Sequence, residues 1–89
     1  MRITFSATKN ALNLAKHGVE LTLARQFEWT EILCMPDTRR DYGEVREIGF
    51  GVIGERLYCV VFTQRGEAMH VISLRKANSR EVRLYVEQS

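Results

Sequence analysis

An α+β fold, with helices packed on one antiparallel sheet, is predicted by the order of the apolar patterns along the chain. Apolar residues recur at helical spacing in the N-terminal third and again at the C-terminal end, whereas the middle holds apolar runs of strand length. Short polar turns separate these runs, as in an antiparallel meander. Grouped strands, rather than strands alternating with helices, indicate the α+β class. The 89 residues contain no linker rich in Pro, Gly or Ser, so we predict one domain over residues 1–89.

The N-terminal part is predicted to hold two helices. Residues 2–5 form either a short strand or a lead-in. A helix fits residues 8–17, where apolar side chains share one side, and Gly18 is expected to end it in the left-handed conformation. A second helix is predicted over about 20–29, where apolar residues recur three and four apart. Residues 31–35 are typical of a strand that ends at the single proline of the chain.

Three further strands are predicted in the middle of the chain. Residues 37–44 hold five charges and a glycine, which indicates an exposed loop. The strand over 45–53 contains two glycines, a sign of a bulge or of close backbone approach. Residues 57–63 are apolar on both faces, so this strand is expected at the centre of the sheet. The last strand fits 69–74.

A C-terminal helix is predicted over about 79–87. Asn78 and Glu81 have the spacing of a capping box, in which each side chain binds the backbone N–H of the other residue. Apolar residues follow at helical spacing. The chain is therefore expected to end on a helix that begins directly after its most basic stretch.

Charge is unevenly distributed although the net charge is only +2. Residues 1–19 carry three basic and no acidic residues, and residues 65–89 carry five basic against three acidic ones. Residues 20–64 carry five basic against eight acidic ones. If the first and last helices flank the same face of the sheet, their charges form one surface that can bind phosphate.

The sequence predicts a cytoplasmic protein without a membrane segment. No apolar run approaches the roughly 20 residues that span a bilayer, and the N-terminus lacks the apolar stretch of a secretory signal. Cys34 and Cys59 both lie in apolar stretches and are interpreted as two buried thiols in a reducing compartment. No metal-ligand cluster, glycine-rich nucleotide loop or hydrolase triad pattern occurs, so no metal or cofactor is expected.

The densest basic feature lies between the last strand and the last helix. Arg75 and Lys76 precede the helix and Arg80 lies in its first turn, where free backbone N–H groups also point outward. This arrangement suits a phosphate group. A solvated charged turn explains the same residues equally well.

Two histidines and one strand pair are the other chemical candidates. His17 is expected at a helix end, and His70 on an open sheet face, where a lone histidine is more often structural than catalytic. Glu44 and Arg46 lie two residues apart and so share one face of a strand. They could act as an acid/base and its phosphate anchor, but an exposed ion pair is the favoured interpretation.

Three stretches, in order along the chain, together resemble the BrnT-type toxin family. Residues 9–19 resemble its opening K-N-x-x-N-x-x-K-H-G-V pattern, and residues 42–46 its central Y-x-E-x-R pattern, with Gly49 following. Residues 71–85 resemble its closing I-I-S-A-R-x-A and E-x-x-x-Y patterns. An arginine is common directly before this closing stretch, where the present chain has His70.

The resemblance implies a RelE-like fold and a type II toxin–antitoxin system. Such toxins are small cytosolic ribonucleases that stop translation. The implied partner is an antitoxin with a ribbon-helix-helix DNA-binding domain, in a two-plus-two complex that reaches operator DNA through the antitoxin. The His70 departure keeps a second interpretation open, in which a degenerate family member binds RNA or its antitoxin without cleavage. A third is an interaction domain with no nucleic-acid role.

The chemistry expected of such a nuclease needs no metal. A base takes the proton of a ribose 2′-OH, cations stabilise the attacked phosphate, and an acid protonates the leaving 5′ oxygen. Arg75 is the expected phosphate stabiliser, because its planar fork can bind two oxygens, and Arg46 supports it. Glu44 or His17 is the expected base and His70 a candidate acid. The residues expected to contact the rest of the RNA are Lys9, Lys76, Arg80 and Tyr85.

Overall fold

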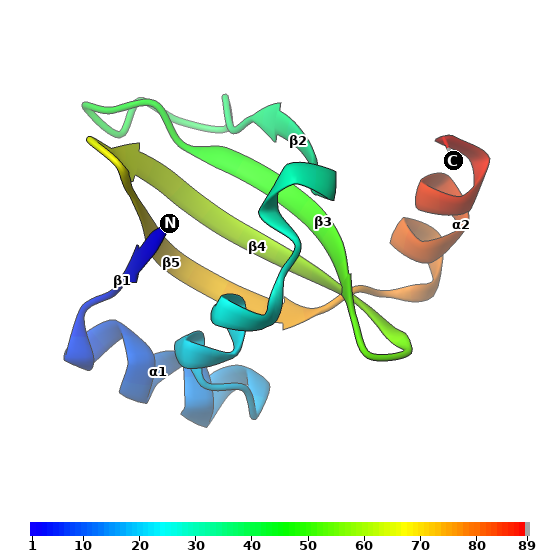
Figure 1. The fold of residues 1–89 in the computed structure, drawn as a ribbon, viewed down its shortest axis with the longest axis horizontal. Helices are drawn as coiled ribbons and strands as arrows, with labels where there is room; N and C mark the ends of the chain where they lie inside the picture. The colour runs from blue at the N-terminus through cyan, green and yellow to red at the C-terminus, as the bar shows by residue number, and fades with distance from the viewer. Residues whose placement is uncertain (89) are drawn as a thin grey trace.

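A five-stranded sheet in the order β1-β5-β4-β3-β2 forms the centre of the computed structural model (Figure 1), which describes residues 1–88. The strands are β1 (Arg2–Thr4), β2 (Leu33–Pro36), β3 (Glu47–Ile53), β4 (Arg56–Arg65) and β5 (Ala68–Lys76). Turns at Gly54 and Gly66, with φ of 63° and 59°, join β3 to β4 and β4 to β5. β4 is the central strand, as its apolar residues on both faces predict.

The α+β class is confirmed, but the sheet is mixed rather than wholly antiparallel. β2, β3, β4 and β5 pair antiparallel with their neighbours, whereas β1 pairs parallel with β5. A tight turn dictates an antiparallel pair, but β1 and β5 are separated by most of the chain, so no turn fixes their direction. The short N-terminal segment is therefore a strand at the edge of the sheet.

Both predicted terminal helices are present with the expected end signals. α1 spans Ala7–His17, and Gly18 ends it with φ 70° while its N–H binds the Leu14 carbonyl. α2 spans Ser79–Gln88. Its capping box is formed, because the Glu81 N–H donates to Asn78 Oδ1 at 2.8 Å and the Asn78 N–H donates to Glu81 Oε1 at 2.9 Å. No helix of residues 1–88 is long and apolar enough to cross a membrane.

The helix predicted over 20–29 is wrong in type. The chain forms two 3-10 helices there, η1 (Leu21–Gln26) and η2 (Trp29–Glu31). The buried residues of this segment, Leu21, Ala24 and Phe27, recur every three positions. This is the period of a 3-10 helix rather than of an α-helix. η1 also ends with an i→i−3 bond, from the Phe27 N–H to the Ala24 carbonyl.

The core lies between the sheet and these 3-10 helices. The buried residues of the cluster are Val19, Leu21, Ala24, Phe27, Val60, Phe62, Val71 and Leu74. Trp29 makes edge-on contacts with both Phe27 and Phe62, at centroid distances of 5.5 and 5.0 Å. Gly49 and Gly51 confirm the predicted close approach: a Cβ would come within 2.7 Å of Ile32 at the first and 2.8 Å of the Phe27 ring at the second.

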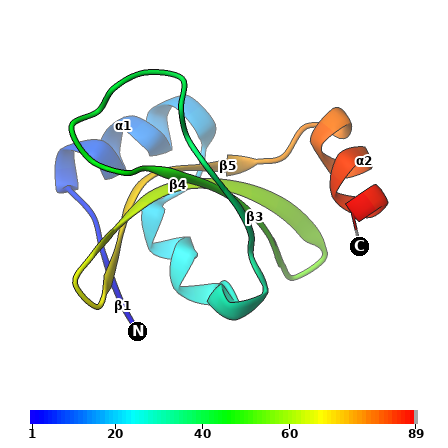
Figure 2. The same ribbon diagram turned by 90° about the horizontal axis from the view of Figure 1, so that it is seen from above.

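The two faces of the sheet are covered differently (Figure 2). η1 and η2 lie on one side, over the core. The loop of residues 37–46 between β2 and β3 lies on the other side, as does α1, which runs along the β5 edge. α2 projects from the end of β5 and buries none of its residues fully. The side opposite the core is therefore bordered by α1, α2 and the loop of residues 37–46, and the 3-10 helices do not cover it.

Candidate active site

The strand register places several predicted site residues on the sheet face opposite the core. Val60 pairs with Leu74 in the core, so the next pairs along the strands, Cys59 with Arg75 and Val61 with Ser73, point to the other face. We call this side the open face. Its residues on β4 and β5 include Cys59, Val61, Thr63, His70, Ser73 and Arg75, of which Cys59 and Thr63 are buried.

Arg75 is held in a fixed orientation on the open face. Its Nη1 and Nη2 donate to Oε1 and Oε2 of Glu81 at 2.7 and 2.8 Å, and Nη1 also donates to the Lys76 carbonyl at 3.3 Å. This hydrogen bonding raises the pKa of Arg75 and lowers the pKa of the Glu81 carboxyl. Glu81 belongs to α2, so the capping residue of that helix also orients the predicted phosphate stabiliser.

Arg46 and Glu44 do not form the ion pair favoured from the sequence. Glu44 pairs instead with Arg65 at 3.2 Å. The alternation of a strand does not apply to them because β3 begins only at Glu47. Arg46 stacks over the Tyr42 ring, 4.1 Å from its centroid, and its buried Nε has no hydrogen-bond partner among residues 1–88.

His17 and His70 lie at different parts of the open side. His17 lines a pocket of about 510 Å³ between α1 and β5, with Lys16 and Ser73 also in its wall. His70 Nδ1 is 2.9 Å from Thr4 Oγ1. Burial lowers the pKa of both imidazoles, followed by the charge of Lys16 for His17 and of Arg65 for His70. A lowered pKa favours the neutral ring, which suits the predicted role of His17 as a base and disfavours the predicted role of His70 as an acid.

The four predicted RNA contacts are not gathered in one place. Lys9 lines the same pocket as His17. Lys76 pairs with Tyr58, so it points away from the face that carries Arg75, and Arg80 is exposed in the first turn of α2. Tyr85 lines a separate apolar groove of about 290 Å³ between α2, β2 and β3. The structure thus brings Lys9 toward the His17 side of the open face and leaves the others at its edge.

The loop of residues 37–46 contains two residues that the sequence interpretation did not single out. It was expected to be an exposed loop, yet the Asp37 side chain is 0% exposed. Arg39 donates to it from Nε and Nη2, both at 2.8 Å. The acid followed two positions later by an arginine is the sequence signal that could have identified this pair. Cys34, expected to be buried, is exposed on edge strand β2, whereas Cys59 is buried as predicted.

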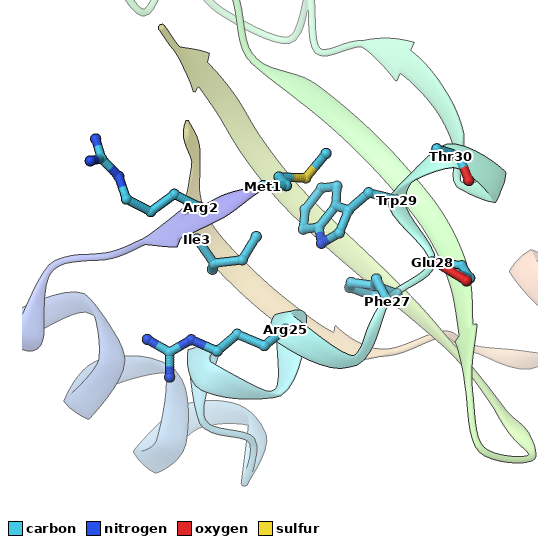
Figure 3. Close-up of a pocket in the computed structure, with 8 residues that line it drawn as sticks. All are labelled: Met1, Arg2, Ile3, Arg25, Phe27, Glu28, Trp29 and Thr30. Carbon is cyan, nitrogen blue, oxygen red and sulfur yellow. The ribbon is translucent and has the colours of Figure 1, made fainter. Parts of the chain in front are cut away.

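A pocket of about 590 Å³ on the core side contains none of the predicted site residues (Figure 3). It lies between the N-terminus and the two 3-10 helices, with Arg2 and Arg25 at one end, Glu28 and Thr30 at the other, and Trp29 between them. The Trp29 indole N–H donates to the Ala24 carbonyl at 3.0 Å and is therefore already satisfied. Among residues 1–88, no group of three His, Cys, Asp or Glu residues is placed to hold a metal ion.

Comparison with known proteins decides the family. Residues 5–81 match the family described as the ribonuclease toxin BrnT of type II toxin–antitoxin systems. The chain belongs to the BrnT family. The crystal structure of the Brucella abortus ribonuclease toxin BrnT superposes with a TM-score of 0.70 at 28% sequence identity, covering 89% of this chain and 99% of that one. A search of curated proteins finds no match.

Membership in the BrnT family confirms the resemblance that the three sequence stretches indicate. The chain is a BrnT-family ribonuclease toxin of a type II toxin–antitoxin system. An RNA substrate and an antitoxin partner follow from that membership. The strand register places Arg75, from the closing stretch, on the open face, and Arg46, from the central stretch, ends the loop that lies on the same side of the sheet (Figure 2).

Proposed function

We propose that this BrnT-family toxin is a metal-independent endoribonuclease that cleaves RNA on the open face and so inhibits translation. One observation carries the location. Arg75, oriented by Glu81, shares one face of β5 with Ser73, and Ser73 lines the same pocket as His17. A fixed guanidinium beside a neutral imidazole supplies a phosphate stabiliser and a proton acceptor at one site.

The proposed reaction is an intramolecular attack within the RNA. His17 takes the proton of a ribose 2′-OH, with Glu44 as the alternative base. The 2′ oxygen then bonds to the adjacent phosphorus while the bond to the 5′ oxygen breaks. Arg75, supported by Arg46, stabilises the added negative charge on the phosphoryl oxygens. An acid, for which His70 is the candidate, gives a proton to the 5′ oxygen, so the products end in a 2′,3′-cyclic phosphate and a 5′-OH.

RNA outside the reacting phosphate is proposed to follow the edges of the open face. Lys9 lines the same pocket as His17, and Lys76 and Arg80 flank the junction of β5 and α2. These cations would hold backbone phosphates, whereas Tyr85 would stack on a base or bind it through its hydroxyl. The salt dependence of RNA binding by the wild-type chain reports the number of such contacts.

Arg75→Ala tests the catalytic proposal most directly. Losing one donor to the developing charge typically lowers a rate about 100- to 1,000-fold, and we expect a fall of that size in RNA cleavage, with loss of growth arrest. Arg83→Ala, which removes an exposed charge from α2, is the control and should cleave like wild type. Circular dichroism checks that both variants fold, and cleavage should persist in a chelator. Wild-type cleavage by Arg75→Ala would remove this residue from the mechanism.

His70, in place of an arginine common in the family, favours one second candidate function. In that alternative the chain is catalytically degenerate and binds RNA or its antitoxin without cutting. The wild-type chain would then bind RNA in a salt-sensitive way but release no 2′,3′-cyclic phosphate. Cleavage that depends on Arg75 would exclude this alternative.

The antitoxin partner is proposed to carry a ribbon-helix-helix domain and to form a two-plus-two complex in the cytoplasm. Family membership supports an antitoxin, and a basic open face favours an acidic or apolar inhibitory segment that blocks RNA access. Operator DNA would be bound through the antitoxin alone. Light scattering of the co-expressed complex measures the stoichiometry, and a one-plus-one mass would contradict it.

A further inference from the structure

The loop of residues 37–46 is organised around a buried carboxylate. Asp37 accepts hydrogen bonds from the backbone N–H of Arg39 at 3.2 Å, from two side-chain nitrogens of Arg39 at 2.8 Å each, and from Tyr42 Oη at 3.2 Å. The Asp37 N–H closes the base of the loop by donating to the Arg46 carbonyl at 2.7 Å. Together with burial of the acid, these bonds give Arg39 one preferred orientation.

Asp37 also positions a second arginine. Tyr42, whose hydroxyl binds the Asp37 carboxylate, presents its ring to the guanidinium of Arg46 at 4.1 Å. The buried Arg46 Nε still has no protein acceptor among the described residues. One inward-facing acid thus sets the positions of two arginines, one through a hydrogen bond and one through an aromatic ring.

Arg39 keeps N–H donors available to solvent. A guanidinium has five, and Asp37 takes only Nε–H and one from Nη2. The side chain of Arg39 remains 67% exposed, whereas that of Asp37 is 0% exposed. The carboxylate is therefore hidden beneath the guanidinium, and the surface that a ligand meets is formed by N–H groups.

The Arg39 guanidinium lies near the predicted reaction site. Arg39 belongs to the loop of residues 37–46, and the open face beside this loop carries the cross-strand pair of Cys59 and Arg75. The loop lies on the same side of the sheet, opposite the 3-10 helices (Figure 2). Arg39 and Arg75 each have their own carboxylate, so both guanidinium groups are pre-oriented on a surface that RNA can reach.

We propose that Arg39 is a phosphate-binding residue for single-stranded RNA, contacting a phosphodiester that neighbours the one held by Arg75. A surface salt bridge that only stabilises the loop does not require the acid to be buried and the arginine exposed. A guanidinium fixed in advance loses little rotational freedom on binding, and its fork matches two phosphate oxygens. This inference rests on the proposed function, because it takes RNA as the ligand of the open face.

The test is binding of a 2′-O-methyl oligoribonucleotide, which cannot be cleaved, by Arg39→Ala and Arg40→Ala. Both substitutions remove one positive charge at adjacent positions, but the exposed Arg40 makes no side-chain hydrogen bond among the described residues. We expect at least about fivefold weaker binding for Arg39→Ala and a salt slope shallower by about 0.7, the value for one phosphate contact on a single strand. Arg40→Ala should change binding less than about twofold. Equal losses would overturn the proposal.

Asp37→Asn separates orientation from charge. This substitution makes the chain more positive, so non-specific attraction alone predicts tighter RNA binding. The proposal predicts weaker binding, because Arg39 and Tyr42 lose their anionic acceptor, and tighter binding would contradict it. A thermal melt identifies any unfolded variant, and Arg39→Lys, which keeps the charge without the fork, then provides the same comparison.

The outcome is independent of catalysis. Weaker binding by Arg39→Ala in a chain that does not cleave RNA would support this site and refute the proposed nuclease. Normal RNA binding by Arg39→Ala together with lost cleavage by Arg75→Ala would support the proposed nuclease and refute the Arg39 site.

Discussion

The two faces of the sheet use the same strands for different purposes. On the core face, Val60, Phe62, Val71 and Leu74 pack against the 3-10 helices and are almost fully buried. On the open face, the intervening residues of β4 and β5 include the partly exposed Arg75, His70 and Ser73 as well as the buried Cys59 and Thr63. Alternation along a strand therefore divides one element between stability and chemistry.

The polar groups of the open side are held by side chains at its border, from α2, from the edge strand β1 and from the loop of residues 37–46. Arg75 depends on Glu81 of α2, His70 on Thr4 of β1, and Arg39 on Asp37 of the loop. These three partners lie at different places around the edge of the open face. The comparison predicts that core-face substitutions reduce the free energy of unfolding, whereas open-face substitutions reduce RNA binding or cleavage.

Leu21→Ala should have the largest effect on stability. Leu21 is 0% exposed beneath the sheet, and removing a buried leucine side chain costs about 2–5 kcal/mol through lost burial and the cavity left behind. Leu12→Ala is the matched control because Leu12 is 60% exposed on α1, and it should change stability by less than about 0.5 kcal/mol. Urea unfolding measures both. Similar losses would show that the core is not confined to one face.

Asn13→Ala should have the next largest effect, because Asn13 connects helix α1 to strand β5 and to Val19 of the core. This buried amide donates to the Val19 carbonyl at 2.8 Å and the Leu74 carbonyl at 2.7 Å, and it accepts from the Leu74 N–H at 3.1 Å. Leaving such buried groups unpaired should cost about 2–3 kcal/mol. Asn78→Ala removes an exposed helix cap instead and should cost about 1 kcal/mol. Equal urea midpoints for the two variants would contradict the proposed role of Asn13 in docking α1.

The sequence predicted what depends on neighbours along the chain. The end of α1 at Gly18, the capping box of α2 and the central position of β4 all follow from local patterns, and all are present. The same patterns misassigned η1, since a three-residue repeat fits a 3-10 helix as well as an amphipathic α-helix. Boundary and period errors of this kind leave the architecture intact.

The partners of the site residues could not be predicted in the same way. Glu44 pairs with Arg65, which is 21 positions away along the chain and approaches only when β4 forms the sheet. The burial of Asp37 likewise depends on the pairing of β2 with β3, which returns the loop onto the open side. Residue type and the family resemblance make Arg46 and Arg75 candidates, but only the three-dimensional fold shows that Glu81 orients Arg75 and that Tyr42, bound to Asp37, stacks on Arg46.

The pH dependence of the free energy of unfolding should be the smallest of these effects. It reports on the open side of the sheet, where both histidines lie. Both histidines lie on the open side, and burial lowers the pKa of each from 6.5. The unfolded chain therefore binds more protons than the folded one as the pH falls below about 6.5, so the free energy of unfolding should decrease in that direction. Asp37 and Glu81, whose pKa values are also lowered, affect stability only below about pH 4.5.

Urea midpoints between pH 7.5 and 5.5 isolate the histidines from those carboxylates. Wild type should lose stability modestly across this range, and His70→Gln should show a shallower slope because one of the two titrating rings is gone. Leu12→Ala, which changes no ionisable group, should keep the wild-type slope. A midpoint that rises toward pH 5.5 would mean that the imidazoles bind protons more tightly in the folded chain. In that case His17 would be protonated near neutral pH, and Glu44 would become the better candidate for the base.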